Sequence, residues 1–294
     1  MAGVAVSSPP EALNIINMDE YLEFLEKKKV SVTQSGFEVI DSELAPFLFD
    51  FQKYCVHRAL QTGRFALFED CGLGKTVQQL EWSRHVSKHT AMPVLILAPL
   101  GVISQTVEEG VKFGYTVTEI ESTDFNKGLE PGIYITNYDN LDNIHSGLFG
   151  GVVLDESSIL KNFTGKTRDK LIIEFKDTPY KLCCTATPSP NDTTELCNHA
   201  EFLNVMSRTE MLAMYFVHDG GSTSDWRLKG HAKQKFWDFV STWAVMLNKP
   251  SDIGYSDNGY ILPPPKRQER DNSHPETRQL ETIQRRCGIR HGLS

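Results

Sequence analysis

Three kinds of feature are missing from this sequence: long apolar runs, paired cysteines and an excess of positive charge. None of its 294 residues falls in an apolar run near the roughly 20 residues that a membrane-spanning helix needs. The N-terminus has no basic segment followed by an apolar one, as a signal peptide has. We therefore expect a cytoplasmic protein with no membrane segment.

The cysteines and the charge each exclude a class of protein. The six cysteines form no C-x-x-C pair, which argues against a zinc site and is typical of free thiols in a reducing compartment. The formal net charge of −8 argues against a protein that coats nucleic acid through its overall charge. A local basic groove remains compatible with this total.

What the sequence does contain is a series of short apolar runs separated by polar stretches. Such runs are typical of strands buried on both faces, and their spacing leaves room for crossover helices. The predicted strands are 64–69, 94–98, 133–136, 151–154 and 181–185. The pattern predicts an α/β fold with a mostly parallel sheet flanked by helices.

The character of the chain changes after this alternating region. We expect helices at 193–216 and 231–248, and the apolar residues of the second recur at helical spacing. These residues are Phe236, Phe239, Val240, Trp243, Ala244 and Leu247. The predicted organisation is an N-terminal extension at 1–40 with a short helix at 18–29, a nucleotide-binding lobe at 41–192, a helical extension at 193–262 and a disordered tail at 263–294.

A candidate phosphate loop follows the first predicted strand. Residues 69–76 read EDCGLGKT and lead into a predicted helix, the context that a P-loop requires. Glycines there let backbone N–H groups turn toward phosphate oxygens, Lys75 reaches the outer phosphates, and the Thr76 hydroxyl can ligate magnesium. The candidate ATP-binding residues are Glu69, Asp70, Cys71, Gly72, Leu73, Gly74, Lys75 and Thr76.

The loop departs from the general P-loop pattern at one position. The pattern G-x-x-x-x-G-K-[ST] places glycine where this chain has Glu69. A second G-K-T, at 165–167, has no strand before it, and we interpret it as a loop without nucleotide.

Two acids follow the predicted strand at 151–154 directly. Asp155 is a candidate magnesium ligand, and Glu156 is a candidate base that polarises the attacking water. Taken alone, they could be solvated acids at the end of a strand. Together with the P-loop they predict an ATP site whose catalytic residues are Lys75, Asp155 and Glu156.

These residues, with others in the same order, resemble the first RecA-like lobe of superfamily 2 DEAD/DEAH-type helicases. Among these, the chain is most similar to the Swi/Snf-like and phage-type ATPases, whose P-loop D-E-x-G-L-G-K-T also carries an acid at the position of Glu69. The further matching elements are Gln52, the segment with Pro99 and Gln105, the segment with Thr136, Asn137 and Tyr138, the DESS box at 155–158, Lys161-Asn162, and Thr185-Ala186-Thr187.

The resemblance implies ATP and Mg²⁺ as cofactors and DNA or RNA as partner. It implies that Gln52 reads adenine and that Thr185, Ala186 and Thr187 couple hydrolysis to nucleic-acid binding. The implied nucleic-acid contacts are Pro99, Gln105, Thr136, Asn137, Lys161, Asn162 and Arg168.

Each implied role has a simpler alternative. Gln52 could be a polar residue on an exposed helix, and Lys161, Lys166 and Arg168 could form a solvated loop. For Trp226, Arg227, Lys229 and His231, packing of the linker is preferred over a surface that binds single strands.

The motors of this family have two RecA-like lobes, and no second parallel-sheet pattern follows residue 190. A truncated or frameshifted gene would explain this, and a second lobe would then act in trans. We expect the chain to bind ATP·Mg, to hydrolyse it slowly and not to unwind a duplex alone. The competing hypotheses are a non-motor P-loop enzyme, such as a small-molecule kinase, and a degenerate nucleotide-binding fragment that acts through a partner.

Overall fold

The computed structural model describes residues 34–121, 128–161, 165–218 and 226–260. All of them belong to one compact unit, Val32–Ser294. The helix expected at 18–29, the tail expected at 263–294 and the candidate contact Asn162 lie outside the described residues.

The centre of this unit is a seven-stranded sheet in which every neighbouring pair is parallel. Its order is β3-β4-β2-β5-β6-β1-β9. The strands are β1 (Arg64–Glu69), β2 (Val94–Ala98), β3 (Val117–Glu119), β4 (Ile133–Asn137), β5 (Gly151–Asp155), β6 (Tyr180–Thr185) and β9 (Ala244–Leu247). The five predicted strands are confirmed, and β3 and β9 were missed.

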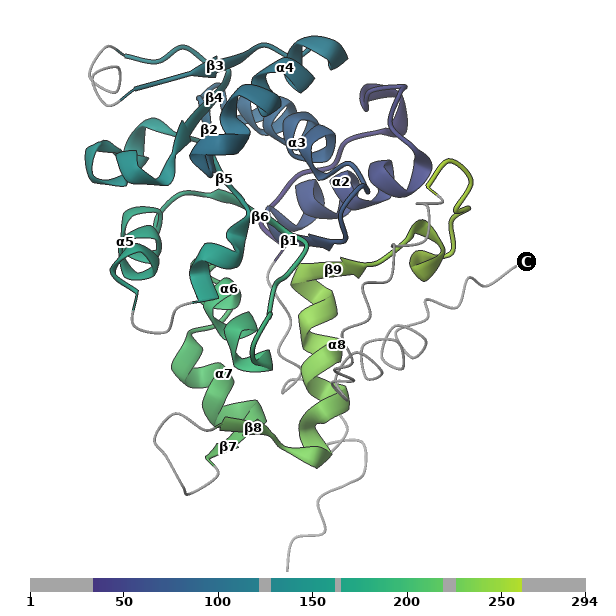
Figure 1. Cartoon of the computed structure of the whole chain (residues 1–294), viewed down its shortest axis with the longest axis vertical. Helices are drawn as coiled ribbons and strands as arrows, with labels where there is room; N and C mark the ends of the chain where they lie inside the picture. The colour runs from purple at the N-terminus through teal and green to yellow at the C-terminus, as the bar shows by residue number, and fades with distance from the viewer. Residues whose placement is uncertain (1–33, 122–127, 162–164, 219–225, 261–294) are drawn as a thin grey trace, which may run out of the picture. The chain divides into compact units, whose positions relative to one another are not determined.

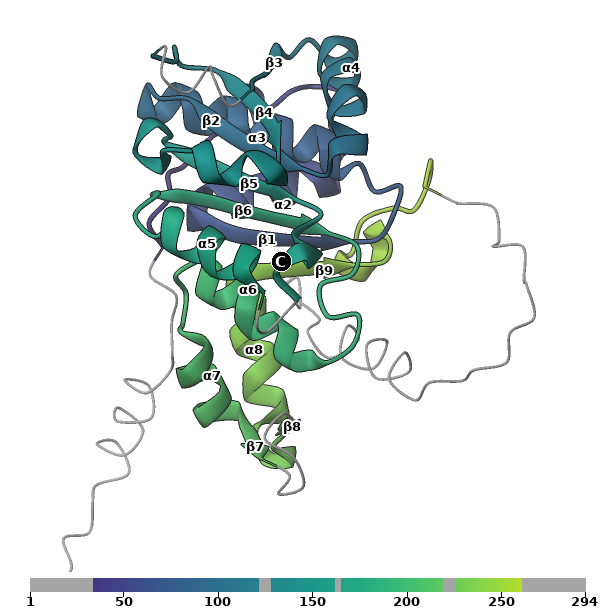
Figure 2. The ribbon, with the colours of Figure 1, turned by 60° about the vertical axis from the view of Figure 1, so that its left-hand side comes forward.

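Helices cover both faces of the sheet, which explains why a strand such as β2, with the sequence VLILA, is apolar and buried along its whole length. One face is covered by α2 (Asp50–Thr62), α3 (Lys75–Thr90) and α4 (Ile103–Phe113), and the other by α5 (Lys166–Glu174), α6 (Leu196–Phe202) and α8 (Lys233–Trp243) (Figures 1 and 2). The arrangement confirms the predicted α/β lobe of RecA type. None of the described helices is long and apolar enough to cross a membrane.

Shorter elements connect these layers. Helix α7 (Arg208–Tyr215) leads into a two-stranded antiparallel ribbon of β7 (Phe216–His218) and β8 (Trp226–Leu228), drawn away from the main sheet in Figures 1 and 2. The 3-10 helices are η1 (Asp41–Glu43), η2 (Leu100–Val102), η4 (Tyr138–Asn143), η5 (Ser146–Leu148), η6 (Ser157–Lys161), η7 (Thr193–Glu195), η8 (Gly230–Ala232) and η9 (Pro250–Ile253).

The helix expected at 231–248 is wrong at its C-terminal end. Helix α8 ends at Trp243, and Ala244–Leu247 form β9, which pairs with β1. Phe236, Phe239, Val240 and Trp243 are buried on one helix face as expected. Ala244 and Leu247 are instead buried in the sheet, because pairing satisfies the backbone groups along β1 that a continued helix would leave open. The segment expected as a helical extension, 193–262, therefore contributes strand β9 to the sheet of the lobe.

Two other local expectations also need correction. The helix expected at 193–216 is divided into η7, α6 and α7, because Asn204, at φ 54°, follows α6 and a capping box at Ser207 starts α7. The second G-K-T does not form a loop, since Lys166 and Thr167 open helix α5.

Candidate functional site

The polar motifs meet at the carboxyl edge of the sheet. Strand β6 lies between β5 and β1, so the segments that leave these three strands are neighbours. They are the P-loop after β1, the DESS box after β5 and Thr185–Thr187 at the end of β6. In open parallel sheets this edge is where ligands bind.

The P-loop turns through two glycines and then enters a helix. Gly72 and Gly74 have φ values of 86° and 80°, which favour glycine, and α3 begins at Lys75. A Cβ atom on Gly74 would lie 2.4 Å from Nε2 of Gln52, so the loop also packs closely against α2. The Lys75 ammonium donates to the backbone oxygens of Glu69 at 2.7 Å and Asp70 at 3.1 Å. The helix N-terminus and the lysine together fit a phosphate group.

Gln52 is part of this loop's packing rather than a polar residue on an exposed helix. Its side chain is buried, and its Nε2 donates to the Leu73 carbonyl at 2.9 Å and to the Tyr260 hydroxyl at 3.1 Å. Its Oε1 accepts from the backbone N–H of Phe49 at 3.1 Å. The alternative interpretation of Gln52 as an exposed residue is therefore wrong.

The Glu69 side chain lies in the interior of the lobe. Its carboxylate is fully buried and accepts a hydrogen bond from Nε2 of Gln78 at 2.7 Å. Burial raises its pKa to about 7, against the opposing effects of the Gln78 hydrogen bond and the Lys75 charge. This acid therefore anchors the start of the loop to α3 and is not placed to contact phosphate.

Glu156 has an unusual backbone conformation that hydrogen bonds hold in place. Its φ is 56°, and its Oε1 accepts from the Thr185 hydroxyl at 2.6 Å and from the Ser158 hydroxyl at 2.7 Å. The Thr185 oxygen accepts in turn from the backbone N–H of Thr187 at 3.0 Å. Strain of this kind persists where the surroundings fix it, often in functional sites.

Asp155 is linked to the same network through its backbone. The Tyr138 hydroxyl donates to the Asp155 carbonyl at 2.8 Å. Burial, together with the neighbouring charge of Glu156, raises the pKa of the Asp155 carboxyl to about 6, while Gln79 and Lys75 act in the opposite direction. The DESS box, Tyr138 and the Thr185–Thr187 segment thus form one connected unit.

One member of this unit was missed from sequence: His199 on α6. Its Nε2 lies 3.2 Å from the Ser157 hydroxyl, and its Nδ1 lies 3.3 Å from the Glu195 carbonyl. Burial lowers its pKa to about 4, so the ring is neutral near pH 7. No local pattern marked it, because α6 reads LCNHAEF, with Asn198 and Glu201 close by, and its partner Ser157 is 42 residues away in sequence.

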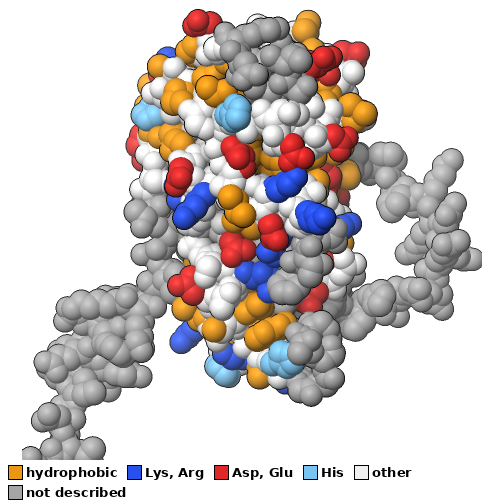
Figure 3. All heavy atoms as spheres, turned by 90° about the vertical axis from the view of Figure 1, so that its left-hand side faces the viewer, with side chains coloured by type: hydrophobic (Ala, Val, Ile, Leu, Met, Phe, Trp, Pro, Cys, Tyr) orange, Lys and Arg blue, Asp and Glu red, His pale blue; other side chains and the backbone are white. Residues whose placement is uncertain are grey.

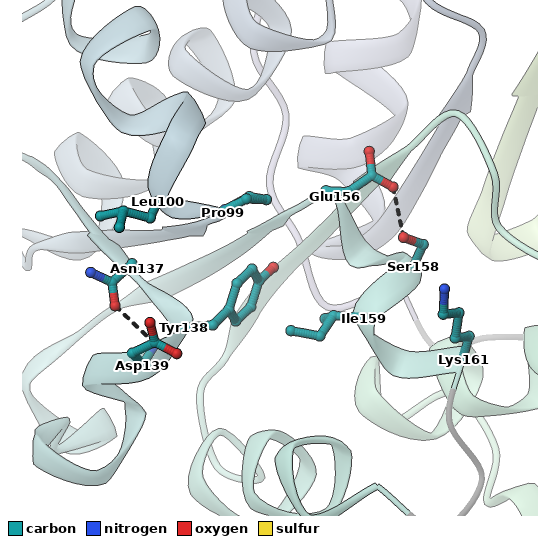
Figure 4. A pocket seen from close by; sticks show the side chains of 9 residues that line it. All are labelled: Pro99, Leu100, Asn137, Tyr138, Asp139, Glu156, Ser158, Ile159 and Lys161. Carbon is teal, nitrogen blue, oxygen red and sulfur yellow. Dashed lines mark hydrogen bonds between the residues drawn. The ribbon is translucent and has the colours of Figure 1, made fainter.

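A pocket of about 390 Å³ opens beside Glu156, at the ends of β2, β4 and β5 (Figure 4). It is lined by Pro99, Leu100, Asn137, Tyr138, Asp139, Glu156, Ser158, Ile159 and Lys161. Three of the candidate nucleic-acid contacts, Pro99, Asn137 and Lys161, are therefore brought together next to the candidate base.

The remaining described candidates lie elsewhere. Thr136 is buried and accepts from the Asn140 amide at 2.8 Å, while Gln105 is exposed on α4 and donates to Glu109 at 3.3 Å. The Arg168 guanidinium is held by Asp169 at 2.6 Å and 2.9 Å and by Asn198 at 3.3 Å. Acidic and basic side chains are interspersed on the face in Figure 3 and form no continuous basic patch there.

Packing explains the basic and aromatic group around β8. The Lys229 ammonium donates to the carbonyls of Ala213 at 2.8 Å and Met214 at 3.1 Å near the end of α7. The Trp226 ring meets the His218 ring edge-on at 5.2 Å. These contacts favour the packing interpretation over a surface for single strands.

The residues at this edge fit ATP with a magnesium ion. Thr76 and Asp155 offer hard oxygen donors, and Mg²⁺ in phosphate sites usually takes one or two protein ligands and completes its shell with phosphate oxygens and water. Within the described part of the chain, no group of three or more His, Cys, Asp and Glu side chains could hold a metal alone. The donor set therefore suits a metal that arrives with a nucleotide.

Comparisons with known proteins concern the family and the fold of the chain. Residues 53–215 match the family model of the SNF2-related domain. The SWI2/SNF2 ATPase core of Sulfolobus solfataricus in complex with dsDNA is similar, with 21% identity and a TM-score of 0.58 over 71% of this chain and 46% of that one. A second structure of that core domain matches with 20% identity and a TM-score of 0.55, over 79% and 50% of the two chains.

The UvsW helicase of bacteriophage T4 also matches, with 16% identity and a TM-score of 0.45 over 66% of this chain and 67% of that one. No curated protein matches this sequence. The chain spans about half the length of the SWI2/SNF2 structures that it matches.

Proposed function

The chain belongs to the SNF2-related domain family, and we propose that it is the ATP-binding lobe of a helicase or translocase that acts on DNA or RNA. The observation that carries the proposal is the connected unit at one edge of the sheet. There the Glu156 carboxylate accepts from the Thr185 hydroxyl. At the same edge the P-loop carries Lys75, and Gln52 donates to its Leu73 carbonyl.

In this proposal the P-loop and its neighbours bind the nucleotide. Gln52 contacts the base, the N–H groups at the start of α3 bind the phosphates, and Lys75 leaves its backbone acceptors to neutralise the outer phosphates. Thr76 and Asp155 would hold magnesium. Bound magnesium supplies charge neutralisation on the phosphate oxygens.

The DESS box and the end of β6 carry hydrolysis and its coupling. Glu156 accepts a proton from the attacking water, and Thr185 keeps that carboxylate in position. Glu156 and Ser158 also line the pocket with Lys161. A nucleic acid bound in that pocket would act on Glu156, the catalytic base, through Ser158. A shift of the Glu156 carboxylate would also reach Thr185–Thr187, because Thr185 donates to it.

The rate expected of the chain alone is low. The P-loop, the DESS box and Thr185–Thr187 contain no arginine, and loss of an arginine finger typically costs about 10³- to 10⁵-fold in rate. A second RecA-like lobe would supply that group. A small-molecule kinase is less compatible with this site, because Thr185 donates to Glu156 and so holds a base that acts on water. A degenerate fragment is less compatible with the complete set of Lys75, Asp155 and Glu156.

The test is ATP hydrolysis, measured as phosphate release over hours with and without single-stranded and double-stranded DNA and RNA. Glu156→Gln should abolish release, because the amide cannot accept the proton. The matched control Glu108→Gln, at an exposed position on α4, should leave release unchanged. Equal rates in the wild type and Glu156→Gln would overturn the assignment of the base, and fast turnover stimulated by nucleic acid would overturn the expectation of an incomplete site.

A further inference from the structure

The segment after β9 returns to the nucleotide site and places an aromatic side chain there. After η9 the chain turns, with the Tyr260 N–H donating to the Asp257 carbonyl at 2.9 Å. The Tyr260 ring then meets Phe49 and Phe51 edge-on, at centroid distances of 4.9 Å and 5.1 Å. Tyr260 thus packs on the start of α2, next to Gln52.

The contact with Tyr260 uses one of the hydrogen-bond donors of Gln52. An amide nitrogen has two hydrogens to donate. One goes to the Leu73 carbonyl at 2.9 Å and the other to the Tyr260 hydroxyl at 3.1 Å. The Oε1 atom accepts from the Phe49 N–H at 3.1 Å and keeps a second lone pair. Gln52 can therefore still accept from a ligand, but it cannot donate to one.

A base with a 6-amino group needs both halves of an amide. Its exocyclic amine donates to the amide oxygen, and its adjacent ring nitrogen accepts from the amide N–H. The Gln52 amide oxygen is available to the exocyclic amine of the base. The N–H that the ring nitrogen needs is instead bonded to the Tyr260 hydroxyl. The phosphate part of a nucleotide does not need Gln52, since the α3 N-terminus and Lys75 provide its contacts.

We propose that Tyr260 occupies the position beside Gln52 that the base of ATP would take, so that ATP must displace the phenol from Gln52 before its base can bind. This inference rests on the proposed function and adds a regulation to it. Base binding and the docking of residues 254–260 on α2 exclude each other. Gly254 and Gly259, both at φ 88°, lie within this segment and give its backbone conformations that other residues rarely adopt. ATP binding therefore releases residues 254–260 from α2.

The test compares ligands with and without a base. ATP, ADP and inorganic tripolyphosphate, each with Mg²⁺, are titrated calorimetrically into the wild type, Tyr260→Phe and the matched control Tyr255→Phe. Tyr255 lies on the same segment and packs on Tyr54 at 6.1 Å. Loss of one neutral hydrogen bond to the occupant should tighten ATP and ADP by about fivefold in Tyr260→Phe. Tripolyphosphate should bind all three proteins alike.

A second variant, Tyr260→Ala, removes the ring and should tighten ATP further. Weaker ATP binding by Tyr260→Ala would overturn the inference, because the ring would then be part of the base site. Equal ATP affinity in the wild type and Tyr260→Phe would overturn the competition alone and leave the proposed function standing. Failure of every variant to bind ATP would overturn both.

Discussion

Two halves of the same sheet edge differ in how their polar side chains are held. In the half that includes β1 and α2, Gln52 and Glu69 are buried and each bonds to another segment of the site. In the half that includes β2 and β4, Leu100 is 67% exposed, and the Asn137 side chain accepts within its own turn, from the N–H groups of Asp139 and Asn140. The first half is fixed from within the chain, whereas the second presents an open pocket.

The difference shows which side of the site has its geometry already in place. A buried polar group left unpaired costs about 1–3 kcal/mol, so substitutions in the first half should disturb several partners at once. The exposed side chains that line the pocket in the second half, such as Leu100 and Lys161, are not buried in this way. We therefore expect large effects on ATP in the first half and small, salt-dependent effects on nucleic acid in the second.

The largest effect is expected for Gly74→Ala. The new Cβ would lie 2.4 Å from Gln52 Nε2, so the Gln52 amide has to move, and alanine is strained at the φ of 80° that the loop needs. ATP binding measured by calorimetry should be lost. The matched control Gly101→Ala lies in the open half, where a Cβ meets no atom within 4 Å, and should bind ATP normally. Normal ATP binding by Gly74→Ala would contradict the fixed geometry of the first half.

Thr185→Val should have the next largest effect, and it tests the junction of the halves. Valine cannot donate to Glu156, and a hydrogen bond to a charged group is worth about 1.5–3 kcal/mol. We expect the kcat of ATP hydrolysis to fall about tenfold or more with little change in KM. The control Thr118→Val, on the exposed part of β3, should not change kcat. A change in KM alone would show that Thr185 acts on binding and not on the base.

Lys181 is a buried basic residue outside the site, on strand β6 of the same sheet. Lys181 enters the interior from β6 and donates to the Phe202 carbonyl at 2.9 Å, and burial lowers its pKa to about 7. Its folded pKa lies below its unfolded value, so the unfolded chain binds more protons between these values. The free energy of unfolding should therefore rise with pH above 7, by at most about 1.4 kcal/mol per unit. Urea unfolding at pH 7 and 8.5 measures this rise.

Lys181→Met is the matched variant for that measurement, since it keeps the apolar stem and removes the titrating group. The pH dependence above 7 should flatten in this variant. An unchanged slope would assign the rise to another group.

The smallest effect is expected for Lys161→Ala in the open half. Loss of one phosphate contact should weaken nucleic-acid binding by a few-fold at moderate salt and lower the salt slope by about one. ATP affinity should stay unchanged. Fluorescence anisotropy of labelled DNA and RNA at several salt concentrations checks this, with the exposed Lys88→Ala as control. If both variants bind alike, Lys161 makes no phosphate contact.

The same contrast explains how much the sequence could predict. The strands, the P-loop and the position of Asp155 and Glu156 follow from local patterns, because each motif spans a strand end and the turn after it. The partner of Gln52 could not be predicted, since Tyr260 is 208 residues away in sequence. Strand β9 was mistaken for helix because its apolar run fits either structure until β1 is there to pair with it.

The most direct test of the central claim is the affinity of ATP for the P-loop. Calorimetric titration of ATP with Mg²⁺ into the wild type, Lys75→Ala and Lys88→Ala compares two lysines of the same helix, one at the loop and one exposed in its last turn. We predict binding by the wild type and by Lys88→Ala, and a loss of at least about tenfold in Lys75→Ala, because a charged contact to phosphate is removed. Equal ATP affinity in Lys75→Ala and the wild type would contradict the assignment of this loop as the phosphate site.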